Sequence, residues 1–159
     1  ELETFDLAGI PFYDGDVAAT GTPGAVQRLK GSIERANALL IVTPEYNYSL
    51  PAVLKNAIDW ASRAPNVLSD KPIAIMGASA GPYGTTRAQL HLRQVLVYSE
   101  ALVMVKPQLF IAGAGDKFDE HGNLHDAETR ERVKALLAAL AAWVNRLSPV
   151  VENVDTSSV

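Results

Sequence analysis

The sequence predicts an α/β fold in which a parallel sheet lies between two layers of helices, the three-layer doubly wound architecture. Two observations and one general rule support this prediction. Short apolar runs alternate along the chain with longer segments whose apolar residues recur at helical spacing. The short runs are apolar throughout, which is typical of strands buried on both faces. Connections between parallel strands are right-handed, so the helices fall on both sides of the sheet.

The first 36 residues predict the end of a strand, a loop and a helix. Residues 2–6 resemble the end of a strand, and a loop rich in Gly and Pro follows at residues 8–11. Thr22-Pro23 combines a capping residue with proline at the first helical position, and it predicts a helix that ends near Ala36.

A continuous apolar run at residues 38–43 predicts a buried strand that Pro44 ends. A loop at residues 45–50 follows, with Ser49 as a plausible helix cap. The next segment has apolar residues at helical spacing: Val53, Leu54, Ala57, Ile58 and Ala61.

The second half repeats the alternation. Residues 72–76 predict a strand, residues 77–84 a loop of small residues, and residues 85–98 a helix. Residues 102–105 and 109–111 predict one strand, bent at the Lys-Pro pair between them.

Asp126 is expected to cap the last helix. Its apolar stripe consists of Val133, Leu136, Leu137, Leu140, Trp143, Val144 and Leu147. A length of 159 residues without repeats or a linker indicates one domain over residues 1–147, with a polar tail at residues 148–159.

Composition excludes several classes of function. The net charge is −4 and the 14 Lys and Arg residues form no block, which argues against nucleic acid as a partner. The absence of cysteine excludes thiol catalysis, iron–sulfur clusters and zinc–thiolate sites. No apolar run is long enough to span a membrane, and the first residues do not read as a signal peptide, so we expect a cytoplasmic protein.

Two loops that leave predicted strands have the composition of a ligand site. In residues 44–51, two prolines bracket two tyrosines and an asparagine, which suits a stiff loop that holds a flat aromatic ligand. In residues 77–84, missing side chains let a ring approach the backbone. Either loop taken alone is also consistent with an ordinary connection.

Residues 43–51 read Thr-Pro-Glu-Tyr-Asn-Tyr-Ser-Leu-Pro, and residues 54–63 read Leu-Lys-Asn-Ala-Ile-Asp-Trp-Ala-Ser-Arg. This stretch closely resembles the NADPH-dependent FMN reductase family, which includes chromate, quinone and azo-dye reductases. Agreement in type and order continues in five later segments: residues 71–72, 77–79, 87–89, 91–94 and 117–119. The likeness extends over residues 5–147.

The resemblance implies a flavodoxin-like fold and an FMN-containing oxidoreductase. FMN would accept hydride from NADPH or NADH and pass electrons to a small acceptor: free flavin, a quinone, an azo dye or chromate. The flavin carries the redox chemistry, so no catalytic side chain is expected. The residues implied to contact the flavin ring are Pro44, Glu45, Tyr46 and Asn47 on one side, and Ala78, Ser79, Ala80 and Gly81 on the other.

The resemblance also implies a homodimer or homotetramer, with Tyr48 and Ser49 near a partner subunit. Arg87 would then meet either a nicotinamide phosphate or a carboxylate at the subunit interface. Two alternatives to the reductase stay open. One is a flavodoxin-type electron carrier, or another flavin-binding protein, that does not oxidise NAD(P)H directly. The other is a domain without a cofactor.

Members of the family begin with a strand and a Gly-Ser-x-Arg loop that cradles the FMN phosphate at a helix N-terminus. The sequence starts within what reads as the second strand, so we expect the first strand–loop–helix unit to be absent from it. Leu90 and Gln108 stand where relatives often have tyrosine and glutamate.

The remaining candidates read as structural residues. His91 is interpreted as a surface or interface residue, and no metal site is expected at His121 and His125, because their spacing matches no standard ligand pattern. Asn56, Asp59 and Trp60 are interpreted as packing and capping residues of their helix.

Overall fold

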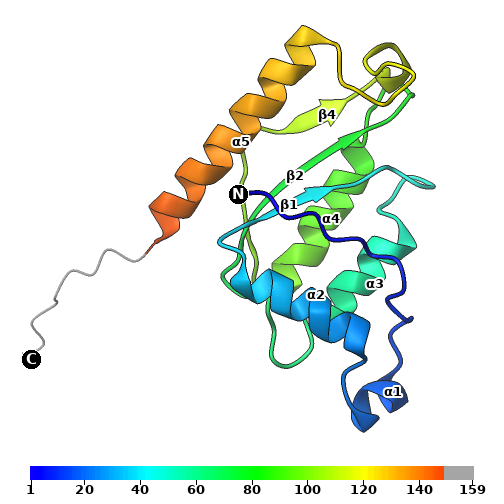
Figure 1. The fold of residues 1–159 in the computed structure, drawn as a ribbon, viewed down its shortest axis with the longest axis vertical. Helices are drawn as coiled ribbons and strands as arrows, with labels where there is room; N and C mark the ends of the chain where they lie inside the picture. Colours follow the sequence, from blue (N-terminus) through cyan, green and yellow to red (C-terminus); the bar gives the residue numbers. More distant parts are fainter. Residues whose placement is uncertain (149–159) are drawn as a thin grey trace, which may run out of the picture.

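The computed structural model describes residues 1–148, and its centre is a parallel sheet (Figure 1). Strand β1 (Leu39–Val42) pairs with β2 (Pro72–Ala78), with Leu39 opposite Ile73. On the other side of β2 lie two short strands, β3 (Leu102–Val103) and β4 (Leu109–Ile111), one after the other. The expected bent strand is therefore confirmed, and its two halves flank a proline that has no N–H to donate.

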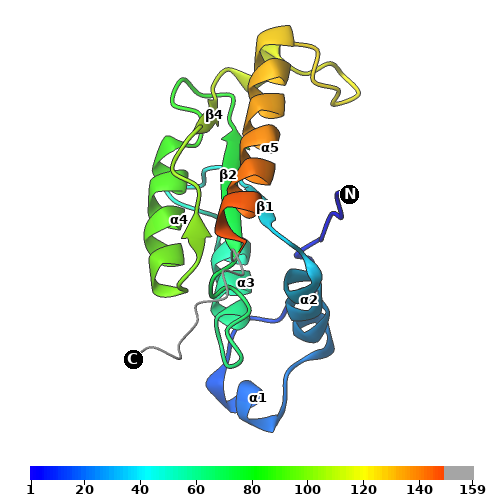
Figure 2. The ribbon, with the colours of Figure 1, turned by 90° about the vertical axis from the view of Figure 1, so that its left-hand side faces the viewer.

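Helices cover both faces of the sheet, as the sequence predicts (Figure 2). The helical elements are α1 (Gly15–Thr20), α2 (Gly24–Arg35), α3 (Ala52–Ala61), α4 (Thr86–Tyr98), the 3₁₀ turn η1 (Ala114–Asp116) and α5 (Ala127–Leu147). Helices α2, α3 and α4 pack on one face of the sheet, and α5 packs on the other. The described residues thus form the three layers of a doubly wound fold.

The alternation of side chains along β2 divides the core into two clusters. Ile73 and Ile75 point into the larger cluster, where they meet Leu92 and Leu96 of α4. Ala74 points to the other face, into a smaller cluster that contains Leu109, Ile111 and Leu136. A strand whose two faces are both buried has no polar position, which explains the uninterrupted apolar runs.

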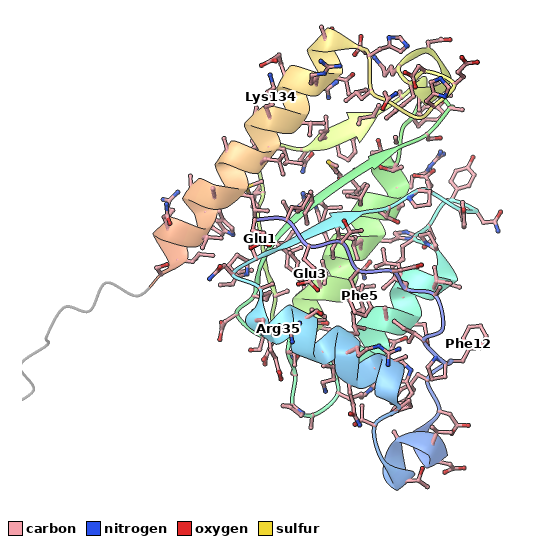
Figure 3. The ribbon with its side chains drawn as sticks, in the orientation of Figure 1. Glu1, Glu3, Phe5, Phe12, Arg35 and Lys134 are labelled. Carbon is pink, nitrogen blue, oxygen red and sulfur yellow. The ribbon has the colours of Figure 1, made fainter. Side chains whose placement is uncertain are left out.

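The predicted strand at residues 2–6 is wrong. The segment pairs with no strand among the described residues, and a cavity of about 740 Å³ is lined by residues of this segment, of α2 and of β1. Phe5, Leu7 and Ile10 fix it by packing against the larger cluster. Figure 3 shows Glu1, Glu3 and Phe5 along this segment, with Arg35 on neighbouring α2. Among the described residues, β1 pairs with a strand only along its β2 edge.

Local capping signals had mixed outcomes. Asp126 caps α5 as expected, because its side chain accepts a hydrogen bond from the amide of Thr129. The N-cap of α2 is Pro23 itself, not Thr22, and that of α3 is Pro51, without a side-chain cap. Helix α1 was not predicted from the sequence. The predicted tail lies almost wholly outside the described residues.

Candidate functional site

The two loops singled out in the sequence meet at the carboxyl ends of β1 and β2. Neighbouring parallel strands end at the same edge of a sheet, which is where such folds bind ligands. A cavity of about 370 Å³ opens between the loops and α4. The cavity is lined by Glu45, Asn47, Tyr48, Ser79, Gly81, Pro82, Tyr83, Gly84 and Arg87.

Half of the eight predicted contact residues line this cavity. Those four are Glu45, Asn47, Ser79 and Gly81. The other four, Pro44, Tyr46, Ala78 and Ala80, are their direct neighbours in the chain but do not line it. Their contact with a flavin stays a prediction. Tyr83 and Arg87 line the cavity but were not among the eight. These two residues could have been identified from the sequence, because an aromatic side chain lies within the glycine-rich loop at residues 77–84 and a basic side chain follows shortly after it.

The first loop turns back on itself over residues 46–49. The amide of Tyr46 donates to the carbonyl of Ser49, and the amide of Ser49 donates to the carbonyl of Tyr46, both at 2.9 Å. Asn47 and Tyr48 have φ angles of 49° and 67°. Asparagine adopts this left-handed conformation readily, whereas tyrosine pays about 1 kcal/mol for it. Such backbone cost persists only where surrounding contacts hold the turn.

The second loop is tied to the segment that follows β4. The amide of Ser79 donates to the carbonyl of Ile111 at 2.9 Å, and the amide of Ala114 donates to the carbonyl of Ser79 at 3.0 Å. The amide of Gly113 donates to the carbonyl of Gly81 at 3.3 Å. Hydrogen bonds to a distant segment fix the course of this loop, so the cavity has one stiff wall.

Gly77 allows the two loops to approach each other. A Cβ atom at this position would overlap the carbonyl oxygen of Thr43 and the hydroxyl of Thr85. Thr43 follows the last residue of β1, and Thr85 precedes the first residue of α4. The sequence predicts that the small residues of this loop let a ligand ring approach the backbone. At Gly77 the missing side chain instead makes room for the protein's own atoms, the Thr43 carbonyl and the Thr85 side chain.

Glu45 and Arg87 join the first loop to α4. The Nε of Arg87 donates to Oε1 of Glu45 at 2.6 Å, and the Glu45 side chain is only 6% exposed. Burial alone would raise the pKa of Glu45, but hydrogen bonds from the Ala88 amide and from Arg87 outweigh it, and the net shift of the pKa is downward. The carboxylate is therefore ionised and fully engaged with the protein.

The structure gives structural roles to Asn56, Asp59 and Trp60, as expected. The side chains of Asn56 and Trp60 both donate to the carbonyl of Pro11, and Asp59 pairs with Lys55. His91 is exposed on α4, with Nδ1 3.0 Å from the hydroxyl of Ser49. Within residues 1–148 no three His, Asp or Glu side chains gather as a metal site would require. None of the described helices is long and apolar enough to cross a membrane.

The chain matches the family model described as NADPH-dependent FMN reductase over residues 1–116. It is 52% identical over 147 residues to the NAD(P)H-dependent FMN reductase of Pseudomonas aeruginosa, covering 92% of this chain and 80% of that protein. It is 43% identical over 150 residues to the NAD(P)H:quinone oxidoreductase of Solanum tuberosum, covering 92% of this chain and 77% of that protein.

Solved structures agree with these matches. The structure superposes with a TM-score of 0.80 on FerB, a flavoenzyme NAD(P)H:(acceptor) oxidoreductase from Paracoccus denitrificans. Sequence identity is 34%, and the match covers 88% of this chain and 78% of FerB. The azoreductase AzrA, at 17% identity and a TM-score of 0.53, shares the fold. The parallel α/β architecture expected from the sequence is thereby confirmed.

Proposed function

Because the chain belongs to the NADPH-dependent FMN reductase family, we propose that it is an FMN-containing oxidoreductase that transfers electrons from NAD(P)H to a small acceptor. The observation that carries the proposal is the cavity between two stiff loops at the tips of β1 and β2. The relatives from P. aeruginosa and S. tuberosum are named as FMN and quinone reductases. Free flavin, quinones, azo dyes and chromate are the acceptor classes we propose.

The residues present fit the edge of a flat ring. The turn at residues 46–49 and the loop at residues 79–81 are both held by backbone hydrogen bonds, so they lose little freedom on binding. Small side chains on the second loop leave its wall of the cavity open. We propose that residues 44–47 and 78–81 contact the ring of FMN, which supplies the redox chemistry when bound.

The protein's own contribution is binding and orientation. No side chain is assigned a catalytic proton transfer, because the carboxylate of Glu45 is already engaged by Arg87 and the amides of α4. We propose NADPH as the preferred donor, with NADH as the alternative. A cytoplasmic location follows as a proposal, since reduced pyridine nucleotides are held inside cells.

Assembly as a homodimer or homotetramer is also a proposal. Three exposed apolar side chains support it, namely Tyr48 in the cavity wall, Val53 on α3, which follows the first loop, and Leu90 on α4, which also carries the cavity residue Arg87. Single exposed apolar residues are ordinary, but three on elements that border one site favour a contact surface.

Anaerobic mixing with NADPH tests the reductase directly. We expect the full-length protein to bind added FMN. The yellow absorbance of the bound flavin should bleach within seconds of NADPH addition, and a quinone should restore it. Persistent colour would instead identify an electron carrier. A full-length protein that gains no flavin would overturn the proposal altogether.

The predicted ring contacts need a separate test. Gly81→Val places a branched side chain in the cavity, where the glycine backbone has room for a Cβ atom. We expect it to weaken FMN binding at least about tenfold without loss of fold. Gly15→Val is the matched control, because a Cβ at Gly15 meets no atom within 4 Å and α1 is remote from the cavity. Equal FMN affinity in both variants would exclude this cavity as the flavin site.

A further inference from the structure

The first turn of α4 has an unusual set of hydrogen-bond partners. The first four amides of a helix have no acceptor within the helix, and a side chain at the N-cap normally serves one of them. The N-cap Thr85 makes no such bond, and its hydroxyl accepts from the side chain of Gln89. The amides of Arg87 and Ala88 instead donate to Oε2 of Glu45, at 2.9 and 3.1 Å.

Glu45 therefore acts as the cap of a helix that begins 41 residues later. The remaining amides of the first turn are satisfied by backbone, Thr86 by the carbonyl of Tyr83 and Gln89 by that of Thr85. A negative charge is also favourable at the positive end of the helix dipole. The carboxylate of Glu45 thus ties the first loop to the start of α4, one turn before the contact between Ser49 and His91.

The same carboxylate holds Arg87 against two aromatic rings. The guanidinium carbon of Arg87 lies 3.8 Å from the ring centroid of Tyr48 and 5.0 Å from that of Tyr83. Tyr48 belongs to the left-handed turn, and Tyr83 belongs to the second loop. A cation over an aromatic face is attracted to it, so Arg87 supports both loops from between them.

We propose that Glu45 is a positioning residue that acts through Arg87. Its carboxylate fixes the guanidinium between Tyr48 and Tyr83 and thereby sets the wall of the cavity. On this view, which rests on the proposed function, Glu45 offers the flavin its main chain and not its carboxylate. When the carboxylate is lost, the guanidinium is released toward the cavity and the Tyr48 turn loses its support.

A double-mutant cycle separates action through Arg87 from direct contact with the flavin. In Glu45→Gln, the amide oxygen can still accept from the first turn of α4, while the amide nitrogen cannot accept from Arg87 Nε. Arg87→Met removes the guanidinium and keeps much of the side-chain volume. We expect Glu45→Gln to raise the FMN dissociation constant about tenfold in the wild-type background, and less than about twofold in the Arg87→Met background.

Direct contact predicts the other result. If the Glu45 carboxylate touched the flavin, the substitution would weaken binding by the same factor with or without Arg87, and the proposal would be overturned. Glu131→Gln is the control, because the Glu131–Lys134 pair is exposed on α5, away from the cavity, and its loss should leave FMN binding unchanged.

A second readout needs no flavin. Thermal unfolding of the apoprotein should show the same coupling, so that the shift in midpoint caused by Glu45→Gln nearly vanishes once Arg87 is replaced. Additive shifts would overturn the positioning role whatever the flavin result. Coupled unfolding shifts in a chain that binds no FMN would support the Glu45–Arg87 link and refute the proposed function, so the two failures are distinct.

Discussion

Helices α4 and α5 begin in opposite ways. Asp126 caps α5 from the adjacent position in the chain, accepting from the amide of Thr129 at 2.9 Å, with the Lys117 ammonium 3.2 Å away. Glu45 caps α4 from a different loop, and its side chain is almost wholly buried. A local cap stabilises its own helix, whereas a remote cap also fixes two segments relative to each other. The helix beside the cavity carries the remote cap, so its stability and the shape of the site are coupled.

The largest expected effect comes from breaking the approach that allows the remote cap. Gly77→Ala places a methyl group against Thr43 and Thr85, the residues that precede the two joined segments. Backbone must move, and we expect a loss of about 3 kcal/mol in the free energy of unfolding. Urea denaturation measures it. Gly115→Ala, where a Cβ meets nothing within 4 Å, is the control, and equal losses in the two variants would contradict the steric argument.

Removing the remote cap itself comes next. Glu45→Ala leaves two amides of α4 and the Arg87 guanidinium without their acceptor, and we expect a loss of about 2 kcal/mol. The loss should be accompanied by faster amide exchange at Arg87 and Ala88 and at the first loop. Exchange that accelerates in α4 alone would show that the cap does not hold the loop.

The local cap should matter less and only locally. Asp126→Ala removes one acceptor at the exposed start of α5, so we expect the unfolding midpoint to fall by a few degrees. Amide exchange should accelerate in the first turn of α5 and should be unchanged in the first loop. A change in FMN affinity in this variant would break the proposed contrast between the two helices.

The smallest expected effect is on the pH dependence of stability, which compares the carboxylates of Asp126 and Glu45. Hydrogen bonds from Thr129, followed by the interaction with Lys117, lower the pKa of Asp126 to about 2, and the pKa of Glu45 is also lowered from its usual 4.5. A carboxylate with a lowered pKa contributes stability above its unfolded pKa, and this is lost as pH falls through the folded value. We expect the unfolding midpoint to fall less steeply below pH 4.5 in Glu45→Gln and in Asp126→Asn than in the wild type.

This contrast also separates what the sequence could predict from what it could not. The cap at Asp126 was predictable because the carboxylate and the amide that it binds are three residues apart. The cap of α4 was missed because Glu45 is remote and Thr85 has the residue type of a cap without acting as one. The resemblance drew attention to Glu45 for a different reason, as a flavin contact.

The strands within the sheet were predicted better than the first residues of the chain. The runs at residues 38–43 and 72–76 became β1 and β2, and β2 is buried on both faces as expected, whereas the residues of β1 are partly buried or, at Val42, exposed. Residues 2–6 mix apolar residues with Glu3 and Asp6 and pair with no strand among the described residues, and strand pairing cannot be inferred from composition. The cavity position followed from topology, whereas the stack of Arg87 on two tyrosines required coordinates.

The division of the core into two clusters has a consequence for fluorescence work. The sequence has two tryptophans, and one lies in each helical layer: Trp60 on α3, which is 2% exposed, and Trp143 on α5, which packs against the smaller cluster. Replacing either one with phenylalanine therefore leaves a single intrinsic reporter, and its emission follows the loosening of one helical layer without a contribution from the other.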